Sequence, residues 1–430
     1  MTQAAAAPTA QRIESLDFLR GVALLGILLM NIVGMGLGPA YDNPTVAGGA
    51  TGVNLWSWII AWVAFEGTQR ALFSILFGAG VILFTQRAEA SGRPDSADLY
   101  FRRNLWLIAF GLVNAWVLLF VGDILYYYGI TGLFLYAFRK LSGQKLLAIG
   151  TAALLLGAAW SAIEAVELLH VHDEYRSAAQ VPEAARSQEQ KAAVEAWRAQ
   201  ESERNPGPQA YAQIRAGVTA SYWSALKSYA PIISHFQSWQ LYRYFFDIFG
   251  AMMIGMALFK LGVLTLEVRR RVYLGMMAAG YAIGLTCNIL EVRWLIANQF
   301  SPLAYTQIEI SYDVGRIGTT MGHLGALMLL LRSGLLGWLR RSLAAVGRMA
   351  LTNYLTHSLV ALVIFVLLGW FGHLQRHQLY FIVFAVWTFQ LAASPLWLKH
   401  FHFGPVEWLW RYLTYGRRPP FRRERGSSPA

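Results

Sequence analysis

The stretch LDFLRGVALLGILLMNIVGMGL, residues 16–37, decides the fold class of this chain. Its apolar residues continue for about the 20 residues that a helix needs to cross the hydrocarbon core of a bilayer. Two polar residues, Arg20 and Asn31, interrupt the run eleven positions apart. At about 100° per residue, both side chains leave one face of a helix. Because polar residues inside membrane helices usually face a bundle interior or an aqueous cavity, this pair is a candidate functional site.

Similar apolar stretches recur through the 430 residues, of which 56% are hydrophobic and only 14% charged. We therefore predict an all-α, polytopic membrane helix bundle with about ten transmembrane helices and a polar extracytoplasmic helical insert. The predicted spans cover residues 16–37, 69–86, 104–121, 123–139, 146–168, 241–261, 272–290, 308–331, 346–369 and 378–398. The chain then divides into membrane helices 1–5 (1–169), the insert (170–238), membrane helices 6–10 (239–400) and a basic tail (401–430).

Positive charge alternates between the predicted loops. One side carries Arg87, Arg93, Arg102, Arg103, Arg139, Lys140, Lys145, Lys260, Arg269–Arg271, Arg332, Arg340, Arg341 and Lys399. The opposite short loops carry few Lys or Arg residues, and a soluble helical protein would not show this alternation. The positive-inside rule places both termini in the cytoplasm and the insert outside. The net charge of +12 is concentrated in a tail that we expect to contact anionic lipids, so it does not indicate nucleic-acid binding.

Before the second predicted span, residues 54–65 contain three Trp residues and are typical of an interfacial helix on the outer surface. The segment ends at Glu66, which stands four positions before Arg70 and is expected to pair with it. In the eighth span, Asp313, Arg316 and His323 share one stripe, where Asp313 and Arg316 form a possible ion pair.

In the ninth span, Asn353 and His357 share a face, and Arg348 stands at the cytoplasmic mouth. A histidine titrates near neutral pH and can act as a general base. Structural hydrogen bonding between helices is the competing interpretation for Asn353, His357 and His323. No metal site is predicted, because the histidine pairs 170/172, 373/377 and 400/402 lack a third or fourth ligand and Cys287 is the only cysteine.

Four motifs in order, RIESLDFLRGVALLGILLMNI, ALFSILFGAGVILF, GRMALTNYLTHS and FGPVEWLWRYLTYG, resemble the YeiB family of bacterial membrane proteins. The first-helix pattern also resembles the transmembrane acyltransferase superfamily, which includes heparan-α-glucosaminide N-acetyltransferase. In that enzyme's family an Arg is followed eleven residues later by an Asn, as Arg20 is by Asn31 here. The resemblance implies a bacterial inner-membrane protein that takes an acyl group from cytosolic acyl-CoA, such as acetyl-CoA. It leaves a homodimer open.

On this hypothesis, arginines at the cytoplasmic mouth and Asn353 bind acyl-CoA, Asn31 polarises the acyl carbonyl, and His357 or His323 is the base. The donor-binding arginines are Arg20, Arg102, Arg103 and Arg348. The outer mouth, with Asp42, Glu66, Arg70, Asp123 and Asp313, receives a saccharide or other small-molecule acceptor from the envelope.

The chain departs from the glucosaminide enzymes because it has no His between Asn31 and His170, where it offers Asp42 and Glu66 instead. Two other functions are therefore kept open. One is a transporter of a small or amphiphilic substrate, whose polar stripe would line the path. The other is a non-catalytic scaffold acting through the insert.

Overall fold

A computed structural model describes residues 13–92 and 94–423, and these ranges are helical apart from turns and one isolated bridge between Phe401 and Arg422. The helices are α1 (Glu14–Leu37), α2 (Gly52–Phe65), α3 (Thr68–Ala90), α4 (Ser96–Trp116), α5 (Leu125–Leu135), α6 (Gly143–Ala179), α7 (Gln188–Arg204), α8 (Pro208–Thr219), α9 (Tyr222–Gln237), α10 (Trp239–Lys260), α11 (Arg270–Ala297), α12 (Pro302–Ser333), α13 (Gly337–Arg348), α14 (Ala350–Ala361), α15 (Arg376–His400) and α16 (Pro405–Tyr415). A short helix, η1 (Gly38–Tyr41), follows α1, and a π-helical turn, η4 (Leu362–Leu367), follows α14.

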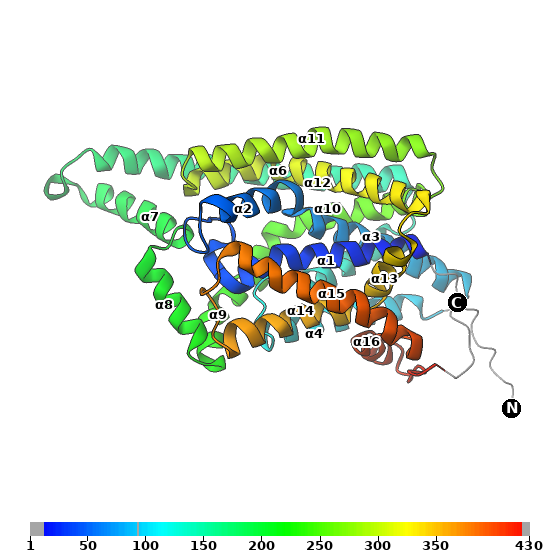
Figure 1. The fold of residues 1–430 in the computed structure, drawn as a ribbon. Helices are drawn as coiled ribbons and strands as arrows, with labels where there is room; N and C mark the ends of the chain where they lie inside the picture. The colour runs from blue at the N-terminus through cyan, green and yellow to red at the C-terminus, as the bar shows by residue number, and fades with distance from the viewer. Residues whose placement is uncertain (1–12, 93, 424–430) are drawn as a thin grey trace, which may run out of the picture.

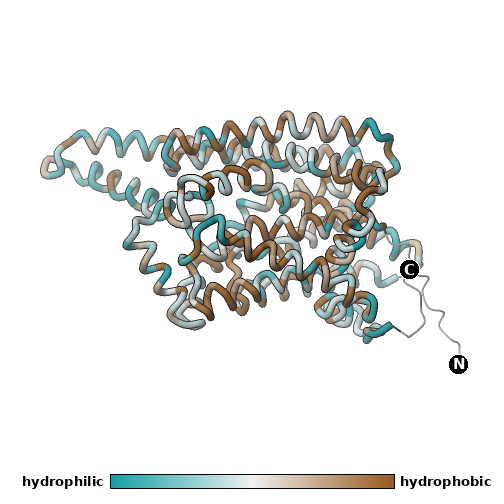
Figure 2. The backbone as a smooth tube through the Cα atoms, in the orientation of Figure 1, coloured by the Kyte–Doolittle hydropathy of each residue, from teal (hydrophilic) through white to brown (hydrophobic). Residues whose placement is uncertain are grey.

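The long helices run along one axis of the molecule (Figure 1). We call the end where α1 begins and where α13 and α16 lie the terminal end, and the end that carries α7, α8 and α9 the insert end. Hydrophobic residues fill the middle of the bundle, and hydrophilic residues gather toward the ends, most clearly in the insert (Figure 2). This distribution is that of a multi-pass membrane protein.

Helix α1 lies in the core, where Leu19, Leu24 and Leu28 are buried. A Cβ on Gly21 would lie 2.0 Å from the carbonyl oxygen of Leu343, and one on Gly347 would lie 1.9 Å from that of Asp17. Glycine is required at both positions because the backbones of α1 and α13 approach so closely, as small residues allow in membrane bundles.

Eight segments within the described residues are long and apolar enough to span a membrane. The predicted spans 104–121 and 123–139 correspond to α4, with 21 residues, and α5, with 11. These helices form a hairpin whose turn lies under α9. The Tyr222 hydroxyl donates to the Val117 carbonyl (3.0 Å), and Trp116 Nε1 donates to Gln237 Oε1 (2.8 Å). The insert therefore covers a hairpin in which α5 is too short for a full span, and neither α4 nor α5 is among the eight segments that are long and apolar enough to span a membrane.

Helices α2 and α3 are separated by a sharp break, as predicted for residues 54–65 and the span 69–86, and α3 with its 23 residues is by itself long enough to cross a bilayer. Trp58 and Trp62 of α2 are buried against Phe300 and Tyr305 near the insert end, and His323 on α12 contacts the Ala64 carbonyl at 2.8 Å. The aromatic residues that indicated an interfacial helix are thus mostly packing residues.

The break between α2 and α3 requires Gly67, which has φ +64°. A Cβ there would meet Tyr312 Oη at 2.3 Å and Arg316 Cδ at 2.4 Å. Only glycine adopts this backbone conformation at no cost.

The insert differs in detail from its prediction. Helix α6 continues to Ala179, eleven residues beyond the expected end of the span at 168. The basic tail is described only as far as residue 423, so Arg425 and the rest of the tail lie outside the described residues.

Candidate functional site

A cavity of about 470 Å³ opens at the terminal end between α1, α3, α4, α5, α13, α14 and α16. Its lining includes five arginines, which are Arg20, Arg87, Arg103, Arg348 and Arg411. The acidic residues in the lining are Asp17 and Glu407. Asp17 forms an ion pair with Arg20 at 3.1 Å. The mouth therefore has an excess of positive charge and suits an anionic ligand.

Arg103 is held near the centre of this arginine group. Its guanidinium lies over the ring of Trp410 at 4.5 Å and over that of Phe84 at 5.4 Å. Burial lowers the pKa of Arg103, and the like charges of Arg411 and Arg20 act in the same direction. A bound anion would relieve this repulsion, as at many ligand sites with shifted pKa values.

Helix α16 closes one side of the mouth through Glu407. This carboxylate accepts hydrogen bonds from Leu351 N (2.6 Å), Thr352 N (3.0 Å) and Thr352 Oγ1 (2.5 Å) at the start of α14. Burial raises the pKa of Glu407, while these hydrogen bonds act against the rise. Trp410 Nε1 also donates to the Arg103 carbonyl at 3.0 Å, so α16 is fixed to both α14 and α4.

The inner end of the cavity is apolar and aromatic, and Phe73, Leu76, Tyr128 and Tyr354 are among its lining residues. The Tyr354 hydroxyl accepts from Ile124 N (3.1 Å) and donates to Asp123 Oδ1 (3.5 Å). The Tyr128 hydroxyl bonds Ser74 Oγ (2.7 Å) and donates to the Arg70 carbonyl (3.0 Å). The cavity therefore ends at two tyrosines, one of which leads to Arg70.

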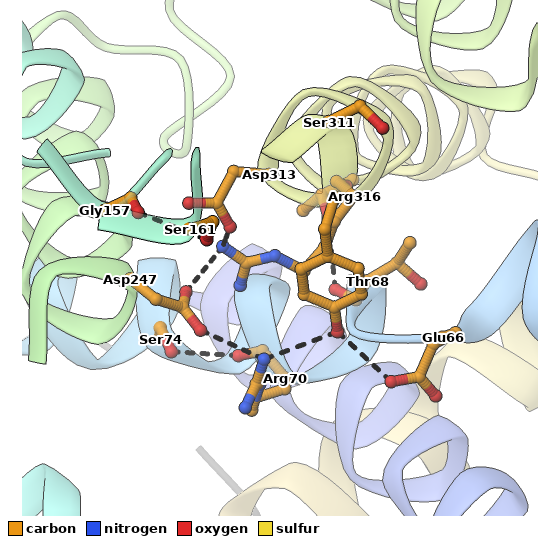
Figure 3. Close-up of polar contacts among 12 residues, drawn as sticks. Glu66, Thr68, Arg70, Ser74, Gly157, Ser161, Asp247, Ser311, Asp313 and Arg316 are labelled. Atoms are coloured by element: carbon orange, nitrogen blue, oxygen red, sulfur yellow. Dashed lines mark hydrogen bonds and ion pairs between the residues drawn. The ribbon is translucent and has the colours of Figure 1, made fainter. Parts of the chain in front are cut away.

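Arg70 belongs to a group that we call the central ion cluster, formed by Arg70, Asp247, Asp313 and Arg316 (Figure 3). Asp247 on α10 pairs with Arg70 at 3.0 Å and with Arg316 at 2.5 Å, and Asp313 pairs with Arg316 at 2.6 Å. Arg316 is only 1% exposed and Asp247 7%. Charges held inside a membrane bundle at this depth are expensive and usually functional.

The structure confirms the predicted pair of Asp313 and Arg316, but the predicted pair of Glu66 and Arg70 is wrong. The break at Gly67 takes Glu66 out of helical register with Arg70. Arg70 turns to Asp247 instead, and Glu66 accepts from the hydroxyls of Tyr41 (2.5 Å) and Tyr312 (3.1 Å).

Three of the four arginines predicted at the donor site, Arg20, Arg103 and Arg348, line the cavity. Arg102 lies outside it, where it pairs with Asp98 at 2.8 Å on the exposed face of α4. Asn353 is also outside, because its amide donates to Val346 O (3.2 Å) and Ser394 Oγ (3.1 Å) in the packing between helices.

The three predicted catalytic residues are not brought together. Asn31 lies on α1 away from the cavity lining. His357 is buried and bonds Gln390 Oε1 at 3.0 Å on α15. His323 lies between the Tyr281 hydroxyl (3.0 Å) and the backbone of α2. Helix rotation, which is set by packing, turns both histidines toward neighbouring helices.

The predicted acceptor residues divide into separate places. Asp42 lies at the insert end, 3.8 Å from Arg204. Burial raises the pKa of Asp42, and the charges of Arg204 and Arg376 oppose the rise. Asp123 lies in the turn between α4 and α5, where it accepts from Asn114 Nδ2 (2.8 Å) and Tyr126 N (2.9 Å).

Sequence reasoning missed Asp247, Arg87, Arg411, Tyr128 and Tyr354 as site residues. Asp247 carried a usable signal, since it is an acidic residue within a predicted span. Arg411 stands inside one of the four quoted motifs, whereas nothing in the spacing of the two tyrosines pointed to a site. Among the described residues, no group of three or more His, Cys, Asp or Glu side chains could hold a metal ion.

Comparison with known proteins identifies relatives along almost the whole chain. Residues 258–417 match a family described as "Protein of unknown function (DUF418)". The chain is 32% identical to the protein YeiB of Escherichia coli K12, over 94% of this chain and 96% of that protein. It is 29% identical to YxaH of Bacillus subtilis 168, over 95% of each chain. It is also 25% identical to a 39.9 kDa protein from the amylase 3′ region of Bacillus acidopullulyticus. No solved structure matches.

Proposed function

The chain belongs to the YeiB family of multi-pass bacterial membrane proteins, and we propose that it is an acyl-CoA-dependent acyltransferase. The acyl donor would bind in the terminal-end cavity, and the acceptor would be a saccharide or another small molecule of the cell envelope. The observation that carries this proposal is the arginine-lined mouth above an apolar inner end. A ligand with phosphates at one end and an uncharged reactive group at the other fits that division.

The arginines would bind the phosphate groups of acyl-CoA. Guanidinium groups bind phosphate oxygens through paired, charge-assisted hydrogen bonds. Arg20, Arg103 and Arg348 come from α1, α4 and α13, so one anion in the mouth would connect three helices. We further propose that the terminal end faces the cytosol of a bacterial inner membrane, because cytosol is where acyl-CoA is made available and where positive loops are retained.

The thioester would then lie near Tyr128 and Tyr354. The Tyr354 hydroxyl, which donates its one proton to Asp123 in this structure, would turn from that carboxylate and donate to the carbonyl oxygen as negative charge develops on it. The acceptor would approach from the side of Asp123 and Arg70, the predicted acceptor residues nearest this end. His357, His323 and Asn31 lie outside the cavity, so their variants test whether the reaction uses the cavity's own groups.

Transfer of labelled acetyl groups tests the proposal. The purified chain is incubated with radiolabelled acetyl-CoA and an envelope extract, and acid-stable label on the acceptor fraction is counted. Arg103→Gln removes a cavity arginine, and Arg102→Gln is its matched control because that exposed neighbour lies outside the lining. Loss of one charge-assisted contact is expected to lower transfer at limiting donor about tenfold or more in Arg103→Gln and to leave Arg102→Gln near wild type. Absence of transfer by the wild type, or equal loss in both variants, overturns the proposal.

A transporter is the second candidate, and the break between α2 and α3 beside the central ion cluster favours it. Discontinuous helices beside buried charges form the substrate sites of many transporters. Substrate flux into proteoliposomes that needs no acyl-CoA would support this function over the first.

A further inference from the structure

The break between α2 and α3 places a carboxyl group inside the bundle. Glu66 follows the last residue of α2 and precedes Gly67, and both belong to a 39-residue segment that is apolar enough to cross a membrane. The side chain of Glu66 is half-buried, as are those of Tyr41 and Asp42 toward the insert end. The carboxyl group of Glu66 is therefore partly exposed although protein surrounds it.

The partners of Glu66 are hydroxyl groups. Tyr41 Oη lies 2.5 Å from Glu66 Oε2, and Tyr312 Oη lies 3.1 Å from Oε1. Arg70 Nη2 is 3.4 Å from Tyr312 Oη and so acts on Glu66 through that hydroxyl. A hydroxyl can donate to a carboxylate and accept from a carboxylic acid, so this site can hold either form of Glu66.

Glu66 differs from the neighbouring aspartates because it has no ion-pair partner among the described residues. The central ion cluster pairs two arginines with two aspartates and is neutral by itself. Glu66 adds a third carboxyl group, and within the described residues it makes no ion pair at 4.0 Å or less. An unpaired charge in a membrane bundle is costly, and a bound proton removes that cost.

The groups around Glu66 come from six elements. They are Tyr41 and Asp42 at the end of η1, Arg70 on α3, Asp247 on α10, Tyr305, Tyr312 and Arg316 on α12, Arg376 and Tyr380 on α15, and Arg204 at the end of α7. Arg204 lies on the Asp42 side, at 3.8 Å from that carboxylate, and Arg376 donates to the carbonyl oxygen of Ala40. Arg204 is thus paired with Asp42 and Arg376 is bound to a neutral carbonyl oxygen, so neither arginine forms an ion pair with Glu66.

We propose that Glu66 is a proton-binding site, a carboxyl group in the helix break that takes up and releases one proton from the insert end beside the central ion cluster. The ligand is the proton itself. This inference stands independently of acyl transfer, since it rests on the helix break, the two hydroxyl contacts and the balanced charges next to them.

Infrared difference spectroscopy tests the site on the full chain in nanodiscs, with no acyl donor present. Spectra are recorded as the pH is stepped across the range where the protein stays folded, and the carbonyl stretch of protonated carboxyl groups is followed. The 24 Asp and Glu residues together give a titrating signal, and the wild type is expected to show one component of it that is missing in Glu66→Gln. Glu309→Gln is the matched control, because Glu309 lies on the exposed side of α12 and pairs with Arg243 at 3.1 Å. That variant is expected to retain the band.

A second variant keeps the test decisive if Glu66→Gln does not fold. Tyr41→Phe removes one hydroxyl from Glu66 Oε2 and leaves the carboxyl in place. The band is expected to shift to higher frequency, because the carbonyl loses hydrogen bonding. A band that is identical in the wild type, Glu66→Gln and Tyr41→Phe, or no titrating carboxyl band in the wild type, overturns the proposal. Either result is independent of whether labelled acetyl groups are transferred.

Discussion

Replacing Asp247 by Asn removes one negative charge from the central ion cluster while it keeps the shape of the side chain. Asp247 is 7% exposed and pairs with Arg70 at 3.0 Å and Arg316 at 2.5 Å. The variant leaves two buried guanidinium groups opposite the single carboxylate of Asp313. Breaking a buried ion pair by removing one partner costs about 3–5 kcal/mol, because the remaining charge stays buried. Since Asp247 serves two arginines, we expect a loss in that range.

The free energy of unfolding in mixed micelles measures this loss, and a double-mutant cycle tests its cause. Arg316→Gln alone leaves an excess carboxylate, whereas Asp247→Asn with Arg316→Gln leaves Arg70 and Asp313 in balance. The double variant is therefore expected to lose less than the sum of the two single variants by about 0.5–3 kcal/mol. Glu309→Gln, on a partly exposed pair whose Arg243 also keeps Glu164 as a partner, is expected to lose less than about 1 kcal/mol. Additive losses in the cycle, or a loss below about 1 kcal/mol for Asp247→Asn, would refute the reasoning.

Three further changes give separate tests. Gly67→Ala is expected to lower the free energy of unfolding by more than about 1 kcal/mol, because φ is +64° and the new Cβ would meet Tyr312 and Arg316. An unchanged denaturant-unfolding curve would contradict this expectation. Asp42→Asn tests pH linkage. Burial raises the pKa of Asp42, so the folded state holds the proton more tightly than the unfolded state does. The wild type therefore loses stability relative to the variant as pH rises above about 4. The same difference in melting temperature between the wild type and the variant at every pH would exclude this linkage. Glu407→Gln weakens three hydrogen bonds at the start of α14 and is expected to loosen α16. A faster rate of protease cleavage within residues 405–415 would report this loosening. An unchanged cleavage rate would show that Trp410 holds α16 instead.

Hydropathy alone could predict most of the membrane helices, because bilayer thickness imposes a length and a composition on each span. The predicted boundary at Glu66 agrees with the end of α2 at Phe65, but spacing could not predict how the backbone turns before α3 begins. Glu66 and Arg70 at i, i+4 indicated a continuous helical pair, and only the close approach of α12 to Gly67 shows why the backbone turns there.

Part of the site could also be predicted, because arginines near the terminal end are confined to a narrow layer where α1, α3, α4 and α13 meet. Arg20, Arg103 and Arg348 reach one cavity for that reason. Spacing could not fix the roles of His357 and Asn353, since i, i+4 places two residues on one face without saying which neighbour that face meets. Packing turns both side chains toward α15, where Gln390 Oε1 bonds the His357 ring and Ser394 Oγ accepts a hydrogen bond from the Asn353 amide.

Binding of acetyl-CoA to the purified chain tests the central claim most directly, because the arginine-lined cavity is the basis of the proposed function. Equilibrium dialysis with radiolabelled acetyl-CoA is expected to show one saturable site in the wild type and in Arg102→Gln. Affinity is expected to fall about tenfold or more in Arg103→Gln and in Arg348→Gln. The absence of saturable binding, or equal affinity in the wild type and both cavity variants, would contradict the account.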